Sequence, residues 1–506
     1  MDNLLQIYNG RALSRSDIPD LDFAVFQQTV LEFVRRDGFV VQFFAYENEQ
    51  NVLKLLTVLR SGKELYVCGC SLADEYPSLT SECEKFHMFE REVAEQFGAR
   101  PKDHPWLKMV RYHENYRGKE DVFGNDYSRD IPGNYPYFTV EGDAIHEVAV
   151  GPVHAGIIEP GHFRFQCAGE EVFSLEIQLG YQHRGAEKLL EQAGLPLLRL
   201  PVIAESIAGD TAVGHSLCHS QAIEALAGLE VDEGAMIIRT IALELERIAN
   251  HIGDLGALSG DVAFNPPLNY FGRIRGEFLN LTLTMAGNRF GKGLIRPGGI
   301  AFPVLEEQRR IMLEKITDET PGITNVCDLL FSAHTVLARF EHTGTVSRSV
   351  AEKLGLVGYA GRASGLAYDA RVSFPTEAYD SVQANSNQRT TGDVYSRANV
   401  RREEIMHSLQ AIPELLVKGL DAEPVPVPGS YTLAPDSFVV TMNEAWRGEV
   451  SHCLLTDKNG AILRYKVKDP SFHNWTGLAM SLRNQGISDF PLCNKSFNLS
   501  YCGFDL

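Results

Sequence analysis

The sequence of 506 residues is long enough for two or three domains, since a domain typically holds about 100–200 residues. Its hydrophobic share of 44% and charged share of 22% are ordinary for a folded globular protein, so core volume is not limiting. The formal net charge of −19 argues against a nucleic-acid partner, because phosphate binding requires a basic face.

The sequence also argues against membrane-spanning segments and cysteine-bound metals. It contains no apolar run of about 18 residues, and its first twenty residues lack the apolar core of a signal peptide. The 9 cysteines form no CxxC pair. We therefore expect reduced thiols in a cytosolic protein, and no metal held by this chain's cysteines alone.

Residues 1–135 are predicted to form a small α+β domain. Their patterns predict two helices, two strands and a linker rich in Asp, Gly, Asn, Tyr and Pro: helices 22–36 and 85–97, strands 38–45 and 65–71, and the linker 113–137. We expect the second helix to end near Gly98.

Residues 151–215 contain most of the candidate functional side chains. The stretch 151–166 is too polar and too rich in Gly for a plain core strand, and indicates a strand–loop–strand around a site. A helix should begin near residue 182, and a further helical stretch between Glu205 and His215 is expected to break at Gly209 and Gly214.

The rest of the chain is predicted to be mainly helical up to about residue 420. The expected helices are 182–194, 205–228, 232–258, 268–291, 304–317, 322–341, 345–354 and 397–419. The Pro-rich segment 421–436 marks a boundary, and 437–468 alternates like strands, with a hairpin turn at 458–460. The predicted fold class is thus an α+β N-terminal domain followed by a mainly α-helical large domain, residues 138–506. That domain should carry small peripheral β-sheets and a β-rich part at 430–506.

Several motifs resemble a known family. Residues 76–108, with YPSLT, FEREVAEQFG and HPWL, resemble the small soluble subunit of respiratory complex I. Residues 145–506 resemble the large subunit shared by complex I and membrane-bound nickel–iron hydrogenases, through GPVHAG, EPGHFRF, LGYQHRGAEKL, ELERIANHIGDLGALSGD, NRFGKGLIRPGG, RGEVSH, DPSFHNW and DFPLCNKSFNLSYCGFDL. The closer branch is the fused large subunit of formate-hydrogenlyase and hydrogenase-4 type complexes.

The resemblance does not extend to the nickel–iron ligands. The two CxxC pairs of the hydrogenases align with Ala208 and Thr211 and with Ser500 and Gly503, while Cys502 is displaced by one position. Nickel and iron in this setting need four soft thiolates. The sequence also ends at Leu506, without the long tail that is trimmed after nickel insertion in such enzymes. We therefore expect that this chain is not a hydrogenase and holds no metal.

The resemblance to the quinone site of complex I is partial. The position of the quinone-binding Tyr falls on Val202 or a neighbour, and that of the paired Asp falls on Asp261. The His beside the terminal cluster corresponds to Gly291, whereas Arg184 matches the arginine that raises the potential of that cluster. The residues predicted to line an acceptor cavity are His154, Glu159, His162, Glu205, Asp210, His215 and Asp261. The alternative for His154 and His162 is hydrogen bonding to backbone carbonyls of the loop, and that for Glu205 and Asp210 is hydrogen bonding within a filled cavity.

The function that the resemblance implies is electron transfer in a membrane-bound complex. The chain would form a cavity beside a [4Fe–4S] cluster of an adjacent small subunit, where electrons pass to a quinone or another acceptor and drive ion movement. Expected partners are the small iron–sulphur subunit, ferredoxin-like subunits, antiporter-like membrane subunits and, as a further candidate, a formate dehydrogenase. The expected location is peripheral, on the cytoplasmic side of a prokaryotic membrane. Two alternatives stay open: a non-catalytic scaffold, or an enzyme with an unrelated metal bound through His and carboxylates.

Overall fold

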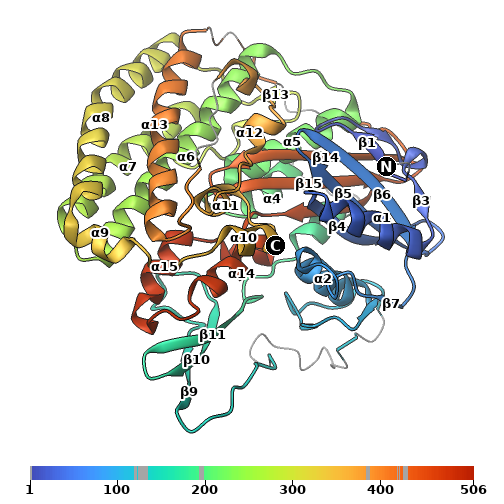
Figure 1. The fold of residues 1–506 in the computed structure, drawn as a ribbon. Coiled ribbons are helices and arrows are strands. Elements are labelled where there is room, and N and C mark those ends of the chain that lie inside the picture. Colours follow the sequence, from blue (N-terminus) through green and yellow to red (C-terminus); the bar gives the residue numbers. More distant parts are fainter. Residues whose placement is uncertain are drawn as a thin grey trace.

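The structure is a computed structural model that describes residues 3–118, 122–123, 135–192, 199–382, 388–418, 420, 422–425 and 431–506. Most of the predicted linker 113–137 and part of the predicted boundary 421–436 lie outside the described residues. The division into domains near residue 135 therefore stays a prediction. Figure 1 shows the N-terminal sheet on one side of the molecule and the long helices on the other, with a central sheet between them.

The N-terminal region forms a mainly antiparallel sheet, in which only β3 pairs in parallel among the described strands, and two helices cover it. Its strands are β1 (Leu5–Ile7), β4 (Phe39–Glu47), β5 (Leu53–Ser61) and β6 (Glu64–Ser71), in the order β1-β6-β5-β4, with β3 (Asp20–Leu21) beside β6. Helix α1 (Phe23–Arg35) buries Phe26, Val30 and Val34, which share one face because they are four residues apart. Helix α2 (His87–Phe97) ends at Gly98, which adopts the left-handed conformation. These elements confirm the predicted helices and strands, although the sequence analysis missed β5.

A second antiparallel sheet lies in the core of the molecule. It contains β14 (Ser437–Ala445), β15 (Gly448–Thr456), β16 (Ile462–Lys468) and the short β2 (Leu13–Ser14), in the order β16-β15-β14-β2. Strands β14 and β15 are buried along their whole length, so the predicted peripheral position is wrong for this sheet. Phe438, Val440 and Met442 of this sheet share a hydrophobic cluster with Val41 and Phe44 of the N-terminal sheet.

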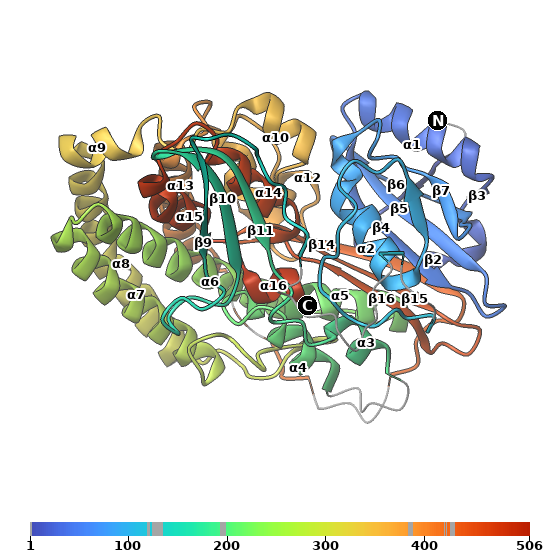
Figure 2. The same ribbon diagram turned by 90° about the horizontal axis from the view of Figure 1, so that it is seen from below.

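Helices cover the other side of the central sheet (Figure 2). The described helices of this part are α3 (Ala186–Glu191), α4 (Arg199–Ser206), α5 (Ala212–Ala227), α6 (Glu233–Asp261), α7 (Asn265–Ala286), α8 (Glu306–Ser332), α9 (His334–Phe340), α10 (Arg348–Leu354), α11 (Gly358–Ala363), α12 (Ala370–Ser373) and α13 (Val394–Leu416). Helix α6 has buried side chains around its whole circumference, and α7 and α13 pack along it.

Two predicted helix boundaries are wrong. We expected separate helices at 304–317 and 322–341, but α8 continues through Pro321. Packing of α7 and α13 along α8 outweighs the loss of one backbone hydrogen bond at the proline. The chain between α4 and α5 does break at Gly209, whereas Gly214 lies inside α5. A Cβ on Gly214 would lie 2.9 Å from Ala445 Cβ, so the glycine allows α5 to pack closely against β14.

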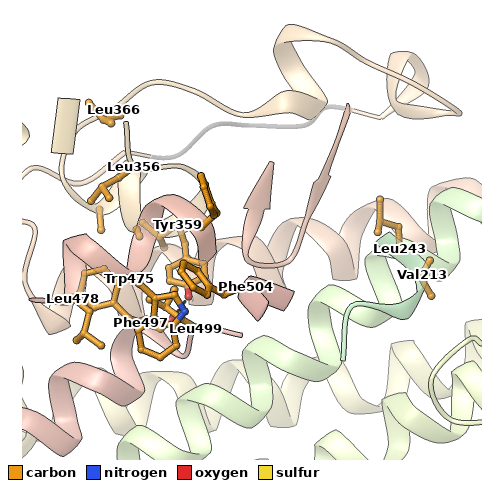
Figure 3. Close-up of a cluster of buried hydrophobic side chains, with 14 of the residues drawn as sticks. Val213, Leu243, Leu356, Tyr359, Leu366, Trp475, Leu478, Phe497, Leu499 and Phe504 are labelled. Carbon is orange, nitrogen blue, oxygen red and sulfur yellow. Dashed lines mark hydrogen bonds between the residues drawn. The ribbon is translucent and has the colours of Figure 1, made fainter. Parts of the chain in front are cut away.

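The predicted strand–loop–strand is confirmed as the pair β9 (Ile145–Val150) and β10 (His162–Ala168), continued by β11 (Glu171–Gln178). The C-terminal helices α14 (Ser471–Ser481), α15 (Phe490–Phe497) and α16 (Tyr501–Asp505) pack beside this sheet. Figure 3 shows Tyr359, Trp475 and Phe497 in the hydrophobic cluster that anchors these helices. Among the described residues, no helix combines the length and apolarity needed to cross a bilayer.

Buried ion pairs join the N-terminal helix α2 to the central sheet. Lys466 Nζ lies 2.7 Å from carboxylate oxygens of both Glu92 and Glu187, and Arg464 Nη2 lies 2.9 Å from Glu187. All four side chains are at most 3% exposed. Burial alone would raise the pKa of Glu187, but Lys466 and Arg464 outweigh it and hold that pKa below its usual value.

We predict that Glu187→Gln lowers the free energy of unfolding at pH 7 by about 3 kcal/mol, because two buried cations lose their carboxylate. Since the folded pKa of Glu187 lies below the ordinary value of 4.5, its contribution is present above that pH and disappears as the pH falls. Urea unfolding of both chains from pH 3 to pH 7 measures the difference. The control Glu306→Gln removes a solvent-exposed pair with Arg309 and should unfold like the parent chain. Equal stability of Glu187→Gln and the control would contradict the prediction.

Candidate functional site

Two segments that are far apart in the sequence meet at the centre of the molecule. One is the α4–α5 connection, residues 207–211, and the other is residues 498–503, which lead into α16. We call the place where they meet the loop junction. Ala208, Thr211 and Ser500 are at most 2% exposed, so the junction is closed to solvent at these positions.

Arg447, in the turn between β14 and β15, bridges the two segments of the loop junction. Its Nη1 and Nη2 donate to Asp210 Oδ1 and Oδ2 at 2.6 and 2.7 Å, and its Nε donates to the carbonyl of Asn498 at 2.7 Å. Burial raises the pKa of Asp210, but the Arg447 cation outweighs burial and the net shift is downward. The indole of neighbouring Trp446 donates to the carbonyl of Asp210 at 2.8 Å and to Thr211 Oγ1 at 3.1 Å.

Arg184 forms a second bridge across the loop junction. Its Nη2 donates to the carbonyls of Ile207 at 2.8 Å and Cys502 at 3.0 Å, and its Nη1 donates to the carbonyl of Ser206. The residue as a whole is exposed, so a fixed positive charge lies at the surface beside the junction. Sequence analysis predicted a functional role for this cation, and the structure places it between the two segments of the junction.

At the four positions aligned with hydrogenase cysteines, the Ser500 and Thr211 hydroxyls make structural hydrogen bonds, Gly503 is tightly enclosed, and Ala208 is fully buried. Ser500 caps α16, because its hydroxyl accepts a hydrogen bond from Gly503 N at 2.8 Å. A Cβ on Gly503 would lie 2.7 Å from Asp469 Oδ2, so this position has no room for a larger residue. Thr211 Oγ1 accepts from Trp446 and, at 3.2 Å, from Arg447 Nη1.

The three predicted site residues in the β9–β10 hairpin divide into two groups. Glu159 acts on the C-terminal helix α16, because burial and the charge of this carboxylate raise the pKa of the Cys502 thiol to about 11. His154 and His162 instead contact the hairpin itself. His154 Nε2 lies 2.8 Å from the carbonyl of Gly161, and His162 Nδ1 lies 3.2 Å from that of Gly151.

The remaining predicted residues do not share one cavity. Glu205 is buried and accepts a hydrogen bond from Gly293 N at 2.6 Å, and burial raises the pKa of its carboxyl. Asp261 is exposed at the end of α6. His215 is fully buried, with Nε2 3.2 Å from Asp469 Oδ2. Thus Glu159, Asp210 and His215 approach the loop junction, and Glu205 and Asp261 line neither of the two cavities described next.

A cavity of about 430 Å³ opens beside the loop junction. This volume falls within the range of about 300–1,000 Å³ typical of small-molecule sites. Its lining residues come from α6, α7, α15 and the junction: Asp210, Asn250, Gly253, Asp254, Gly256, Ala257, Leu268, Gly272, Arg275, Lys495 and Asn498. A narrower cavity adjoins it through Asp210, Asn250 and Arg275, and also contacts Glu246.

Sequence analysis missed three residues at this site. Arg275 lines both cavities and has no hydrogen-bond or ion-pair partner in the described part of the chain. Glu246 is buried and accepts from Val213 N at 2.8 Å and Gly214 N at 3.3 Å, at the N-terminal end of α5. Burial raises the pKa of Glu246 to about 8 despite these bonds. Arg447 and Glu246 lie in the family motifs RGEVSH and ELERIANHIGDLGALSGD, and these motifs could have identified them. Arg275 lies in no such motif, so the sequence offered no signal for it.

Comparison with known proteins places the chain in a family. Residues 261–433 match the family described as the 49 kDa subunit of respiratory-chain NADH dehydrogenase. One subunit of an NADH-quinone oxidoreductase from Herpetosiphon aurantiacus is 30% identical to the chain over 366 residues, which cover 70% of the chain and 96% of that protein. The chain belongs to this 49 kDa subunit family.

Two proteins of hydrogenase complexes resemble the 49 kDa-type chain over longer stretches. Formate hydrogenlyase subunit 5 of Escherichia coli is 29% identical over 84% of this chain and 76% of its own length. Hydrogenase-4 component G of the same organism is 27% identical over 84% of this chain and 75% of its own length. These matches confirm the predicted relationship to complex I, formate-hydrogenlyase and hydrogenase-4 proteins.

A solved structure shares the fold of the 49 kDa-type chain. A chain of the membrane-bound sulfane sulfur reductase, an archaeal respiratory membrane complex, matches with a TM-score of 0.65 and 23% identity. The match covers 72% of this chain and 99% of that one. At this identity the likeness shows the fold alone. Within the described residues, no group of three or more His, Cys, Asp and Glu side chains is arranged to hold a metal ion.

We predict that Gly503→Ala destabilises the chain by about 1–3 kcal/mol, because the new Cβ meets the Asp469 carboxylate. The control Gly276→Ala also lies in a helix but has open space at the Cβ position. It should stabilise the chain by about 0.5–1 kcal/mol, since Ala favours helices more than Gly. Urea unfolding of the two variants measures the change in the free energy of unfolding for each. If Gly503→Ala were more stable than the parent chain, the loop junction would be packed less tightly than described.

We predict that Glu246 makes the chain less stable as the pH rises from about 4.5, its ordinary pKa, to about 8, its raised folded pKa. In that interval the folded state holds a proton that the unfolded state has lost, so unfolding becomes easier with increasing pH. Glu246→Gln should remove this slope from the pH dependence of the urea midpoint. If the urea midpoints of both chains changed with pH in the same way, another titrating group would cause the pH dependence.

Proposed function

We propose that the chain is the large subunit of a complex I-related, membrane-bound oxidoreductase that works without a nickel–iron site. In this proposal the 430 Å³ cavity beside the loop junction is the place where electrons reach a quinone or another small acceptor. The observation that carries the proposal is Arg275, a half-buried cation that lines the cavity and lacks a partner among the described residues. An acceptor with a carbonyl or anionic oxygen would supply that partner.

The donor groups at the loop junction do not fit a nickel–iron pair. Ala208 and Gly503 offer no donor atom, while Thr211 and Ser500 offer hydroxyls that are already hydrogen-bonded. The Cys502 thiol has a raised pKa of about 11 and therefore stays protonated at neutral pH. A nickel–iron pair needs deprotonated thiolates, so we derive no step through such a metal.

In this proposal the electrons come from a [4Fe–4S] cluster of an adjacent small subunit. Arg184 is the chain's contribution to that cluster, because three backbone carbonyls fix its guanidinium at an exposed position. A fixed cation near the cluster raises its reduction potential by stabilising the reduced state. Ferredoxin-like subunits, and a formate dehydrogenase as a further candidate, would supply electrons to the small subunit.

Reduction of an acceptor creates negative charge and requires protons at the cavity. Glu246 is suited to hold one, since its raised pKa of about 8 keeps it protonated near neutral pH. Asp210 and Arg447 fix the wall of the cavity through their ion pair. Antiporter-like membrane subunits would use the resulting change of charge to move ions, with this chain bound peripherally on the cytoplasmic side of the membrane.

One observation favours a second function, a non-catalytic scaffold between the iron–sulphur subunit and the membrane arm. The Trp446 indole and the Arg447 guanidinium occupy the space next to Thr211 and Asp210. Both residues are at most 3% exposed. A scaffold binds no acceptor, so the space next to Thr211 and Asp210 can be filled by side chains without loss of that function. The open cavity, and Arg275 without a partner among the described residues, distinguish the two functions.

We predict that Arg275→Met in the purified whole complex lowers kcat/KM for a soluble quinone analogue about 10- to 100-fold. This corresponds to the loss of one charge-assisted hydrogen bond worth about 1.5–3 kcal/mol. The matched control Arg273→Met, on the same helix but paired with Glu319 at 2.8 Å, should keep the parent rate. The electron paramagnetic resonance signal of the reduced clusters checks that electrons still arrive.

Two outcomes would contradict the proposal. Unchanged kcat/KM in Arg275→Met, with normally reduced clusters, would favour the scaffold or an acceptor that binds elsewhere. Elemental analysis that finds one nickel per complex would overturn the assignment of a metal-free junction.

A further inference from the structure

Five buried side chains form a continuous hydrogen-bonded chain between α5 and the central sheet. The distances are 3.2 Å from Asp469 Oδ2 to His215 Nε2, 3.1 Å from His215 Nδ1 to His452 Nε2, and 2.9 Å from His452 Nδ1 to the Tyr465 hydroxyl. The same hydroxyl lies 2.9 Å from His219 Nδ1. All five residues are at most 1% exposed, so these groups exchange hydrogen bonds with one another rather than with bulk water.

The chemistry of the five groups dictates where the hydrogens lie. Ionised Asp469 can only accept, so Nε2 of neutral His215 carries the hydrogen and Nδ1 accepts from His452 Nε2. His452 Nδ1 then accepts from the Tyr465 hydroxyl, whose oxygen accepts from His219 Nδ1. Every bond in the chain therefore points toward Asp469. The end of the chain is His219 Nε2, a buried nitrogen with no hydrogen-bond partner among the described residues.

One additional proton reverses three of the four hydrogen bonds in the chain. A proton bound at His219 Nε2 allows His219 Nδ1 to release its hydrogen to Tyr465, which passes its own hydrogen to His452 Nδ1. His452 then releases its Nε2 hydrogen to His215 Nδ1. The result is an imidazolium at His215 beside the still ionised Asp469, with His452, Tyr465 and His219 neutral as before and the three hydrogen bonds between His215 and His219 reversed. No bond other than N–H and O–H forms or breaks, and one proton enters for each positive charge that appears.

We propose that Asp469, His215, His452, Tyr465 and His219 are a proton relay that delivers a proton from His219 Nε2 to His215, next to the loop junction. The relay stands on its own as a transfer path; only its use in acceptor reduction rests on the proposed function. Asp469 is the link to the junction, because its Oδ2 lies against Gly503.

The surrounding charges favour His215 as the end point. Asp469 lies directly beside His215 and is ionised, since His215 and Arg447 outweigh burial and lower its pKa. Burial lowers the pKa of His219 to about 3, so a proton leaves it readily. The other groups that act electrostatically on the chain are Asp210 and Arg447 at the junction, Glu187 on α3, and the neutral thiols of Cys218 and Cys453.

The test uses the full chain labelled with ¹⁵N-histidine and follows the ring nitrogens by NMR as the pH is lowered. In the parent chain we expect His452 to change from the Nε2–H to the Nδ1–H tautomer at the same midpoint at which His215 gains its second proton. Tyr465→Phe keeps the ring but removes the connecting oxygen, so the two changes should separate. His219→Gln removes the entry nitrogen and should have the same effect. His251 is buried and bonded to Glu404 at 2.9 Å outside the chain, so its signals should not change.

A single His452 tautomer throughout the titration of His215, or Tyr465→Phe signals that titrate like the parent chain, would overturn the relay. Because no acceptor is present, this result is independent of the quinone assay of Arg275→Met. In the whole complex, Tyr465→Phe should also slow acceptor reduction at least severalfold, with clusters that still reduce. An unchanged rate would overturn the delivery of protons to the acceptor.

Discussion

Buried guanidinium groups are the physical constraint on which this structure depends. Arg239, Arg247, Arg362, Arg397, Arg401 and Arg464 are among the largest side chains that are almost completely buried. Removing such a cation from water costs several kcal/mol, so each must meet carboxylates or carbonyls with good geometry. Arg247, for example, donates to the carbonyl of Glu444 at 2.6 Å and lies 3.1 Å from Glu404. These partners come from different helices and strands, and the ion pairs therefore fix the mutual positions of elements that are distant in the sequence.

The loop junction follows from the same constraint. Arg184 and Arg447 each reach both of its segments, so these two cations hold the junction together. A junction closed in this manner needs no metal for its shape. The proposed chemistry lies in the neighbouring cavity and in groups that exchange protons, which fits a family whose named members are subunits of oxidoreductases.

The parts of the fold with a local signal could be predicted, and the parts determined by distant contacts could not. Local signals identified α1 by its one buried face, α2 by its end at Gly98, and the β15–β16 hairpin by its turn sequence. Strand β5 was missed because its residues are buried on both faces and do not alternate. Glu246 was not identified as a site residue because the local pattern ELER does not reveal that α6 is buried all round. The partners of His215 lie 237 and 254 residues away, so no sequence window could contain them.

The pairing of β2 with β14 has a consequence for biosynthesis. Asn9 donates to the carbonyl of Met442 at 3.0 Å across a separation of 433 residues. Translation proceeds at about 5–20 residues per second, so the N-terminal sheet leaves the ribosome tens of seconds before its partner strands are made. During that interval the apolar face formed by Val41, Phe44 and Val58 has no central sheet to cover it. The nascent chain therefore exposes an apolar surface that favours aggregation for most of its synthesis. A chaperone that covers this face would increase the yield of folded protein.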